Sequence, residues 1–234
     1  MAATDLPSVL RTIRWDDNVA TFCKKPKAAA RVEACLRRTA VWAQQLETAD
    51  KENPALCFVR EAQVQGHYVA ALLAVALYKP AAGAMRALVE NALYYSFFRS
   101  HPQELGTLVR DPAYFLQKSD IIEYHQQHTE RFNENEQKLA LVQHLNGWYK
   151  EISGIVHGQI PGRWVNHAEL ASLSHGPMLG EALTKFEEAA DLVHKLFLAT
   201  VARDLWHDFA KEARETLLHG LNGPVKQALG LSIA

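Results

Sequence analysis

The sequence predicts an all-α protein, an antiparallel bundle of about five to seven helices that ends in a long C-terminal helix. Apolar residues recur at helical spacing through most of the 234-residue chain, and the alternation typical of β-strands is nearly absent. Proline stands near the expected start of several helical segments, where its missing N–H costs nothing. The connections between the first helices of the bundle are short, which makes successive helices antiparallel neighbours.

Residues 1–54 are expected to form an N-terminal extension. Residues 1–26 look irregular, with the stretch WDDN as a turn, and a helix is expected from about Lys27 to Asp50. Residues 23–38 carry six basic side chains against one glutamate. This basic segment is either a solvated helix face or a nucleic-acid contact, and both interpretations stay open.

Residues 55–221 are expected to form the bundle itself. Helical periodicity places its helices at about residues 55–78, 80–100, 113–131, 134–157 and 178–219. A short segment at 103–110 and a loop at 158–177 connect some of them, and residues 222–234 are expected to be a tail. Because loops this long are uncommon in compact domains, the loop at 158–177 is a candidate functional element.

Bulk composition excludes several classes of protein. The formal net charge is −1, so the chain as a whole is not a general polyanion binder. Its three cysteines lack C-x-x-C spacing, so neither a disulfide framework nor a zinc finger is indicated. The N-terminus has no signal-peptide pattern, and the apolar run at 68–78 is too short to span a bilayer. We therefore expect a soluble cytoplasmic protein without membrane contact and without a bound cofactor.

Two pairs of polar residues stand at helical spacing. Arg86 and Glu90 are four residues apart, so they share one helix face and can form an ion pair. This pair either orients the bundle or contacts a ligand or a second subunit. His125 and His128 are three apart, a spacing that suits two ligands of one metal ion, but no third ligand or H-E-x-x-H pattern accompanies them. We expect core or interface histidines there, and no metal site.

The stretch YKEISGIVHG places Tyr149, Ser153 and His157 at successive i, i+4 positions near a helix C-terminus. A protonated histidine gains there from the helix dipole, and Gly158 suits the left-handed position that follows a helix end. Ser153 is not surrounded by a G-x-S-x-G nucleophile motif, and no acid is evident that would orient His157. Serine chemistry is therefore not indicated.

An alanine-rich helical hairpin containing the Arg-x-x-x-Glu of RALVE, followed by the Ser-x-x-x-His-Gly of SGIVHG, resembles the HEPN-like proteins of prokaryotes over about residues 55–200. The resemblance implies a dimeric helical bundle of the kind found in toxin–antitoxin, abortive-infection and other antiviral defence systems. Active members are metal-independent ribonucleases that use an arginine followed by four to six residues and a histidine. In such enzymes arginine stabilises phosphoryl charge, and histidine is the general acid or base for the RNA 2′-hydroxyl.

The chain departs from that pattern at the arginine. Residues 151–156 contain none, and Lys150 stands at the seventh position before His157. Lysine offers a point charge without the bidentate fork of arginine. Arg163, in the loop beyond, could fold back to supply the guanidinium, with His167 nearby. The candidate catalytic residues are therefore His157, Arg163, Lys150 and Ser153, and the candidate binding residues are Arg86, Glu90, Tyr149 and His167.

Two functions remain open at this point. The missing arginine favours a non-catalytic module of a defence or toxin–antitoxin system that binds RNA, a nucleotide or a protein partner encoded in the same operon. The alternative is a metal-independent endoribonuclease, with His157 as general acid or base and Arg163 or Lys150 as the phosphate-stabilising group. In either case we expect a homodimer.

Overall fold

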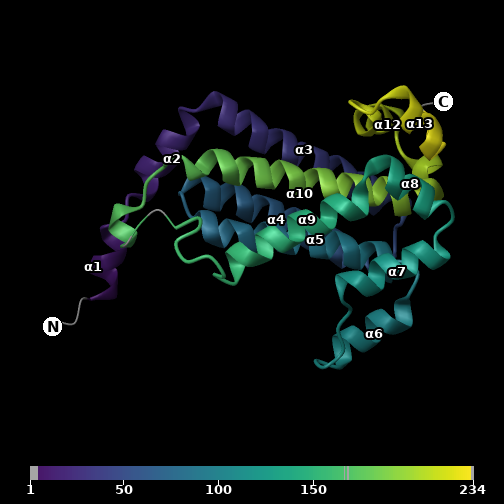
Figure 1. Ribbon diagram of the computed structural model, residues 1–234, viewed down its shortest axis with the longest axis horizontal. Coiled ribbons are helices and arrows are strands. Elements are labelled where there is room, and N and C mark those ends of the chain that lie inside the picture. The colour runs from purple at the N-terminus through teal and green to yellow at the C-terminus, as the bar shows by residue number, and fades with distance from the viewer. Residues whose placement is uncertain (1–4, 166, 168, 233–234) are drawn as a thin grey trace.

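The structure is a computed structural model that describes residues 5–165, 167 and 169–232, and all regular elements in these residues are helices (Figure 1). The predicted all-α fold is confirmed. The α-helices are α1 (Leu6–Arg11), α2 (Trp15–Cys23), α3 (Pro26–Ala49), α4 (Leu56–Ala74), α5 (Tyr78–Phe98), α6 (Pro102–Arg110), α7 (Lys118–His128), α8 (Phe132–Leu139), α9 (Leu141–Val156), α10 (Met178–Thr200), α11 (Ala202–Leu205), α12 (Lys211–Leu218) and α13 (Gly223–Leu229). Two short 3₁₀ helices are η1 (Leu170–Ser172) and η2 (Trp206–Asp208).

Five long helices form the bundle. Helices α3, α4, α5, α9 and α10 run along the long axis of the molecule (Figure 1), with α5 packed against α4, α9 and α10. Ala81, Ala82 and Ala92 of α5 are fully buried, and such small side chains let neighbouring helices approach closely. Burial of the apolar faces stabilises this arrangement by roughly 25 cal/mol per Å² removed from water.

The predicted irregular N-terminus is wrong. Residues 6–11 and 15–23 are helical, and WDDN begins α2, where Asp16 and Asp17 occupy the first turn. Acidic side chains are stabilising there because of the helix dipole. The predicted helix of the extension exists as α3, but Trp42 and Leu46 place it in the same continuous core as α4, α5 and α10. Residues 1–54 thus include one of the five bundle helices.

Two predicted helices are interrupted. The one expected at 134–157 divides into α8 and α9, because Ala140 adopts a left-handed conformation with φ of 49°. The one expected to reach residue 219 ends at Thr200 and is followed by α11, η2 and α12. Trp206 and Phe209 are buried there, and Phe209 packs edge-on against Trp42. This burial outweighs the helical periodicity. The predicted tail contains α13.

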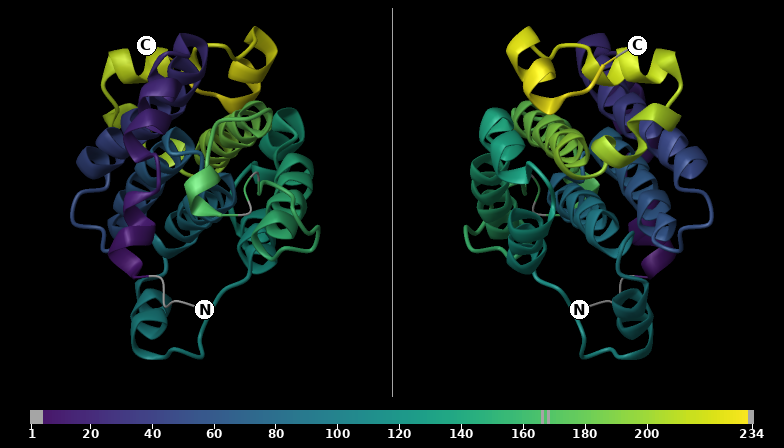
Figure 2. Two further views of the ribbon diagram at one scale, coloured as in Figure 1. Left: turned by 90° about the vertical axis from the view of Figure 1, so that its left-hand side faces the viewer. Right: turned by 90° about the vertical axis from the view of Figure 1, so that its right-hand side faces the viewer.

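Helix α6 and its connection to α7 extend away from the bundle (Figure 2). The prediction of a helix beginning near residue 113 is wrong, since α7 begins at Lys118 and the residues before it are not helical. Val109 and Phe115 in this arm are 79% and 66% exposed. Among the described residues, no helix is long and apolar enough to cross a membrane.

Candidate functional site

Four polar side chains meet between α5 and α9, and we call them the Arg86 cluster: Arg86, Glu90, Tyr149 and His157. Nε of Arg86 donates to Oε1 of Glu90 at 2.9 Å and to the Tyr149 hydroxyl oxygen at 3.1 Å. Nη1 of Arg86 lies 2.9 Å from Nε2 of His157. The Tyr149 hydroxyl donates in turn to Oε1 of Glu90 at 2.5 Å. The predicted Arg86–Glu90 ion pair is confirmed. Tyr149 and His157, two of the three residues predicted at i, i+4 spacing near the helix end, join it.

The end of α9 places His157 at this cluster. His157 is the C-cap residue, and Gly158 follows with φ of +67°, so the predicted left-handed glycine is confirmed. The amide of Gly158 donates to the carbonyl of Ile155 at 3.2 Å, and that of Gln159 donates to Gly154 at 3.0 Å. These two bonds form a Schellman motif, which satisfies the last carbonyls of the helix. The motif holds His157 beside α5.

The contact with Arg86 defines the protonation state of the histidine ring in this arrangement. A guanidinium has only donors, so Nε2 of His157 must accept and the ring proton must lie on Nδ1. The imidazole is therefore neutral. A neutral imidazole that faces a guanidinium has the chemistry of a hydrogen-bond acceptor or a general base.

Arg86 keeps part of its donor capacity. Its side chain is 25% exposed, and its Nη2 has no hydrogen-bond partner among the described residues. Burial, with the charge of Glu90 and its hydrogen bond, raises the pKa of Tyr149 to about 12, so the phenol stays protonated and donates to Glu90. The cluster thus holds Nε and Nη1 of the guanidinium in place and leaves Nη2 for an anionic ligand.

A pocket of about 420 Å³ adjoins the cluster on the side of α7. Arg86, Glu90 and Tyr149 contribute to its wall, together with Phe115 and Lys118. Lys118 donates to the side-chain oxygen of Asn146, and its Nζ lies 5.5 Å from the centroid of the Tyr149 ring. Cζ of Arg86 lies 4.9 Å from the same centroid, so two cations flank one aromatic ring.

Comparisons of the chain with protein-family models, with curated proteins and with solved structures found no match. Any assignment of function therefore depends on the side chains themselves.

Three of the remaining predicted site residues, Arg163, Lys150 and Ser153, make no polar contact with the Arg86 cluster in the described part of the chain. Arg163 pairs with Glu181 of α10 at 3.1 Å and lies 4.0 Å from Glu151 of α9. Its guanidinium therefore binds carboxylates and does not supply the positive charge that was expected beside His157. Lys150 is exposed on α9. The Ser153 hydroxyl is buried without a hydrogen-bond partner among the described residues. His167 is half-buried in the loop that contains Arg163.

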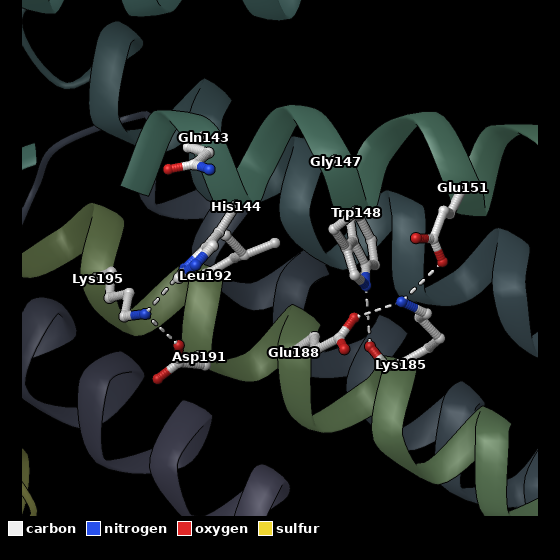
Figure 3. A pocket seen from close by; sticks show the side chains of 10 residues that line it. All are labelled: Gln143, His144, Gly147, Trp148, Glu151, Lys185, Glu188, Asp191, Leu192 and Lys195. Carbon is white, nitrogen blue, oxygen red and sulfur yellow. Dashed lines mark hydrogen bonds and ion pairs between the residues drawn. The ribbon is translucent and has the colours of Figure 1, made fainter. Parts of the chain in front are cut away.

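A second groove, of about 550 Å³, runs between α9 and α10 (Figure 3). Lys185 bridges Glu151 and Glu188, with 2.8 Å to each, and Lys195 lies 2.8 Å from Asp191. The indole of Trp148 donates to the backbone carbonyl of Lys185 at 3.0 Å. The cations of this groove already have carboxylate partners, which makes it a structural seam between the two helices.

In the described part of the chain, His125 and His128 are not part of any group of three or more potential metal-ligating side chains. The predicted core position of His125 is confirmed, because its side chain is buried and bonds to Ser96 at 2.9 Å and to Thr129 at 2.7 Å. Burial lowers the pKa of His125 to about 4, so it is neutral at physiological pH.

Two features of the site escaped the sequence analysis. The Arg86–His157 contact joins residues 71 positions apart, and a single sequence contains no pattern for the packing of α5 on α9. Lys118 was missed because the helix was expected to begin earlier, which hid its place in the first turn of α7. The helical spacing did carry one signal, since it placed Arg86 with Glu90 and Tyr149 with His157 on two polar faces.

Proposed function

We propose that this protein is a HEPN-like helical module of a prokaryotic defence or toxin–antitoxin system that binds RNA through the Arg86 cluster without cleaving it. The observation that supports this is the 2.9 Å contact between Nη1 of Arg86 and Nε2 of His157. The arginine absent from residues 151–156 thereby has a counterpart on α5. A cytoplasmic homodimer that works with an operon-encoded protein partner belongs to the same proposal.

The composition of the cluster favours binding over cleavage. Cleavage at an RNA 2′-hydroxyl needs one group that removes a proton and another that donates one to the leaving oxygen. Within the described residues, the His157 ring hydrogen-bonds to Arg86 alone, and a guanidinium does not release its proton in proteins. Among the described residues, the Arg86 cluster therefore offers a base and a phosphate-binding cation, while the proton of its Tyr149 hydroxyl is already donated to Glu90. That set is sufficient for binding a phosphodiester.

Binding can be measured by the fluorescence anisotropy of a labelled single-stranded RNA titrated with the purified chain. We expect Arg86→Met to weaken binding at least tenfold, since each charge-assisted phosphate contact contributes about 1.5–3 kcal/mol. Arg60→Met is the matched control, because Arg60 also pairs with a glutamate but lies exposed on α4, outside the basic segment at 23–38. Circular dichroism and thermal melts check that both variants fold.

Three results would contradict the proposal. One is equal RNA affinity for Arg86→Met and the wild-type protein. Another is affinity that does not fall as the salt concentration rises, because phosphate contacts release counterions. The third is the absence of RNA binding together with an Arg86-dependent complex with a protein partner, which would make the cluster a protein-docking site.

A metal-independent endoribonuclease is the second candidate, and the neutral, acceptor state of His157 favours it. In that case His157 is the base, Arg86 stabilises the phosphoryl charge in place of Arg163 or Lys150, and a second subunit supplies the acid. Cleavage that persists in a chelator and is lost in both His157→Ala and Arg86→Met would support this candidate. Arg163→Ala is the control expected to retain cleavage, because Arg163 pairs with Glu181. Intact RNA after prolonged incubation would eliminate the endoribonuclease.

A further inference from the structure

We propose that the pocket between α5, α7 and α9 binds a single nucleotide unit, with its phosphate between Arg86 and Lys118 and its base against Phe115. This inference deepens the proposed RNA binding and depends on it. It identifies where one nucleotide of a bound strand lies and which side chains select a nucleotide over a simple anion.

The charges of the pocket favour an anion. Its charged side chains are Arg86, Lys118 and Glu90, two cations against one carboxylate. Glu90 already accepts from Arg86 and Tyr149, so it is the group that positions Arg86. Lys118 has no carboxylate partner among the described residues, and the amide oxygen of Asn146 is its hydrogen-bond acceptor.

The isolation of Lys118 distinguishes this pocket from the groove between α9 and α10. In that groove Lys185 and Lys195 each have a carboxylate at 2.8 Å. Lys118 is half-buried, and burial lowers its pKa because no neighbouring anion offsets the loss of water. A phosphate placed beside Lys118 and Nη2 of Arg86 would supply the missing negative charge and form charge-assisted hydrogen bonds with both groups.

The other walls of the pocket are suited to a planar base. Phe115 is 66% exposed, and its ring contacts no other aromatic ring in the described part of the chain. Leu93 and Ile121 provide buried apolar surface nearby. Bases stack on exposed aromatic rings with little dependence on sequence. The volume of about 420 Å³ lies within the range of small-molecule sites, roughly 300–1,000 Å³.

Isothermal titration calorimetry of the full chain can test this with uridine 3′-monophosphate, uridine and inorganic phosphate as separate probes. We expect the nucleotide to bind more tightly than either part. Lys118→Met and Phe115→Ala should each weaken nucleotide binding about tenfold, by loss of a charge-assisted bond and of base stacking respectively. Lys118→Arg and Phe115→Tyr should retain binding, because they keep the cation and the aromatic face.

Matched controls are available at exposed positions outside the pocket. Lys138→Met removes an exposed lysine of α8, and Val109→Ala truncates a 79% exposed apolar side chain of the same arm as Phe115. Both should leave nucleotide affinity unchanged. Thermal melts of every variant separate loss of binding from loss of folding.

The outcomes distinguish this inference from the function on which it depends. Phosphate that binds as tightly as the nucleotide would overturn the nucleotide assignment, and so would affinities unchanged by Lys118→Met and Phe115→Ala. RNA binding that requires Arg86, with no binding of the mononucleotide, would contradict the proposed nucleotide site but agree with the proposed RNA-binding function. Mononucleotide binding without RNA binding would overturn the proposed function and retain the pocket.

Discussion

Nη1 of Arg86 on α5 lies 2.9 Å from Nε2 of His157 at the C-terminus of α9, across 71 positions of sequence. Because the guanidinium can only donate, this contact requires a neutral imidazole with its proton on Nδ1. Nitrogen-15 NMR of the histidine rings should therefore show the Nδ1–H tautomer as the main neutral form of His157. In Arg86→Met the tautomer population should move toward Nε2–H.

The His157 signal can be assigned by its disappearance in His157→Gln. A His157 ring that carries its proton on Nε2 in the wild-type protein would contradict the contact. The same spectra on the RNA-bound protein would show whether a phosphate replaces the ring as the partner of Arg86.

The buried histidine of α10 predicts a loss of stability in mild acid. The indole of Trp42 donates to Nδ1 of His194 at 3.0 Å, and burial lowers the pKa of His194 to about 3 from its ordinary 6.5. The unfolded chain therefore takes up a proton first as the pH falls. The contribution of neutral His194 to the free energy of unfolding is present above pH 6.5 and is lost progressively as the pH falls to 3. Between pH 7.5 and 5 the loss is about 2 kcal/mol.

Urea unfolding at pH 7.5 and pH 5 measures this difference. His194→Gln offers an acceptor for Trp42 without a titrating ring, so we expect it to reduce the pH dependence. His207→Gln, at an exposed histidine, is the matched control and should leave the wild-type pH dependence intact. An identical acid sensitivity in His194→Gln and wild type would disprove the assignment to His194.

The hydroxyl of Tyr149 links both helices of the cluster, since it donates to Glu90 at 2.5 Å and accepts from Arg86 at 3.1 Å. Tyr149→Phe leaves a half-buried carboxylate and a guanidinium with one partner fewer. We expect the free energy of unfolding to fall by about 1–2 kcal/mol. Tyr68→Phe, at a side chain 55% exposed on α4, should change it by less than about 0.5 kcal/mol. Equal stabilities of the two variants would mean that the link is not formed in solution.

The sequence predicted contacts within a helix and missed those between helices. The ion pair of Arg86 with Glu90 follows from a spacing of four residues, and the helix end at His157 follows from Gly158. The meeting of Arg86 with His157 and that of Trp42 with His194, 152 positions apart, depend on how α5, α9, α3 and α10 pack. Helical periodicity states which face is apolar but not which neighbour covers it.

The helix breaks were missed for a related reason. Ala140 is a strong helix former, and non-glycine residues seldom adopt positive φ. Leu139 and Leu141 on either side are 5% and 0% exposed, so burying both side chains outweighs the local preference of the alanine. Near residue 206 the burial of Trp206 and Phe209 has the same effect on the predicted C-terminal helix.

The turn that positions His157 can be tested through its glycine. Gly158 has φ of +67°, and an added Cβ would lie 3.2 Å from Nζ of Lys79. Gly158→Ala should lower the free energy of unfolding by about 1–2 kcal/mol through left-handed strain, and Gly158→Asn by less, because asparagine tolerates that conformation. The displaced C-terminus of α9 should also weaken RNA binding by moving His157 away from Arg86.

Gly83→Ala provides the opposite case on α5. Outside the adjacent backbone of its own helix, nothing lies within 4 Å of a Cβ added at Gly83, and the residue is inside a helix with ordinary φ. The substitution should stabilise the protein by up to about 1 kcal/mol, since glycine is a poor helix residue. Chemical denaturation of both alanine variants gives the comparison directly. If Gly158→Ala were as stable as Gly83→Ala, the Schellman turn could not be what holds His157 beside Arg86.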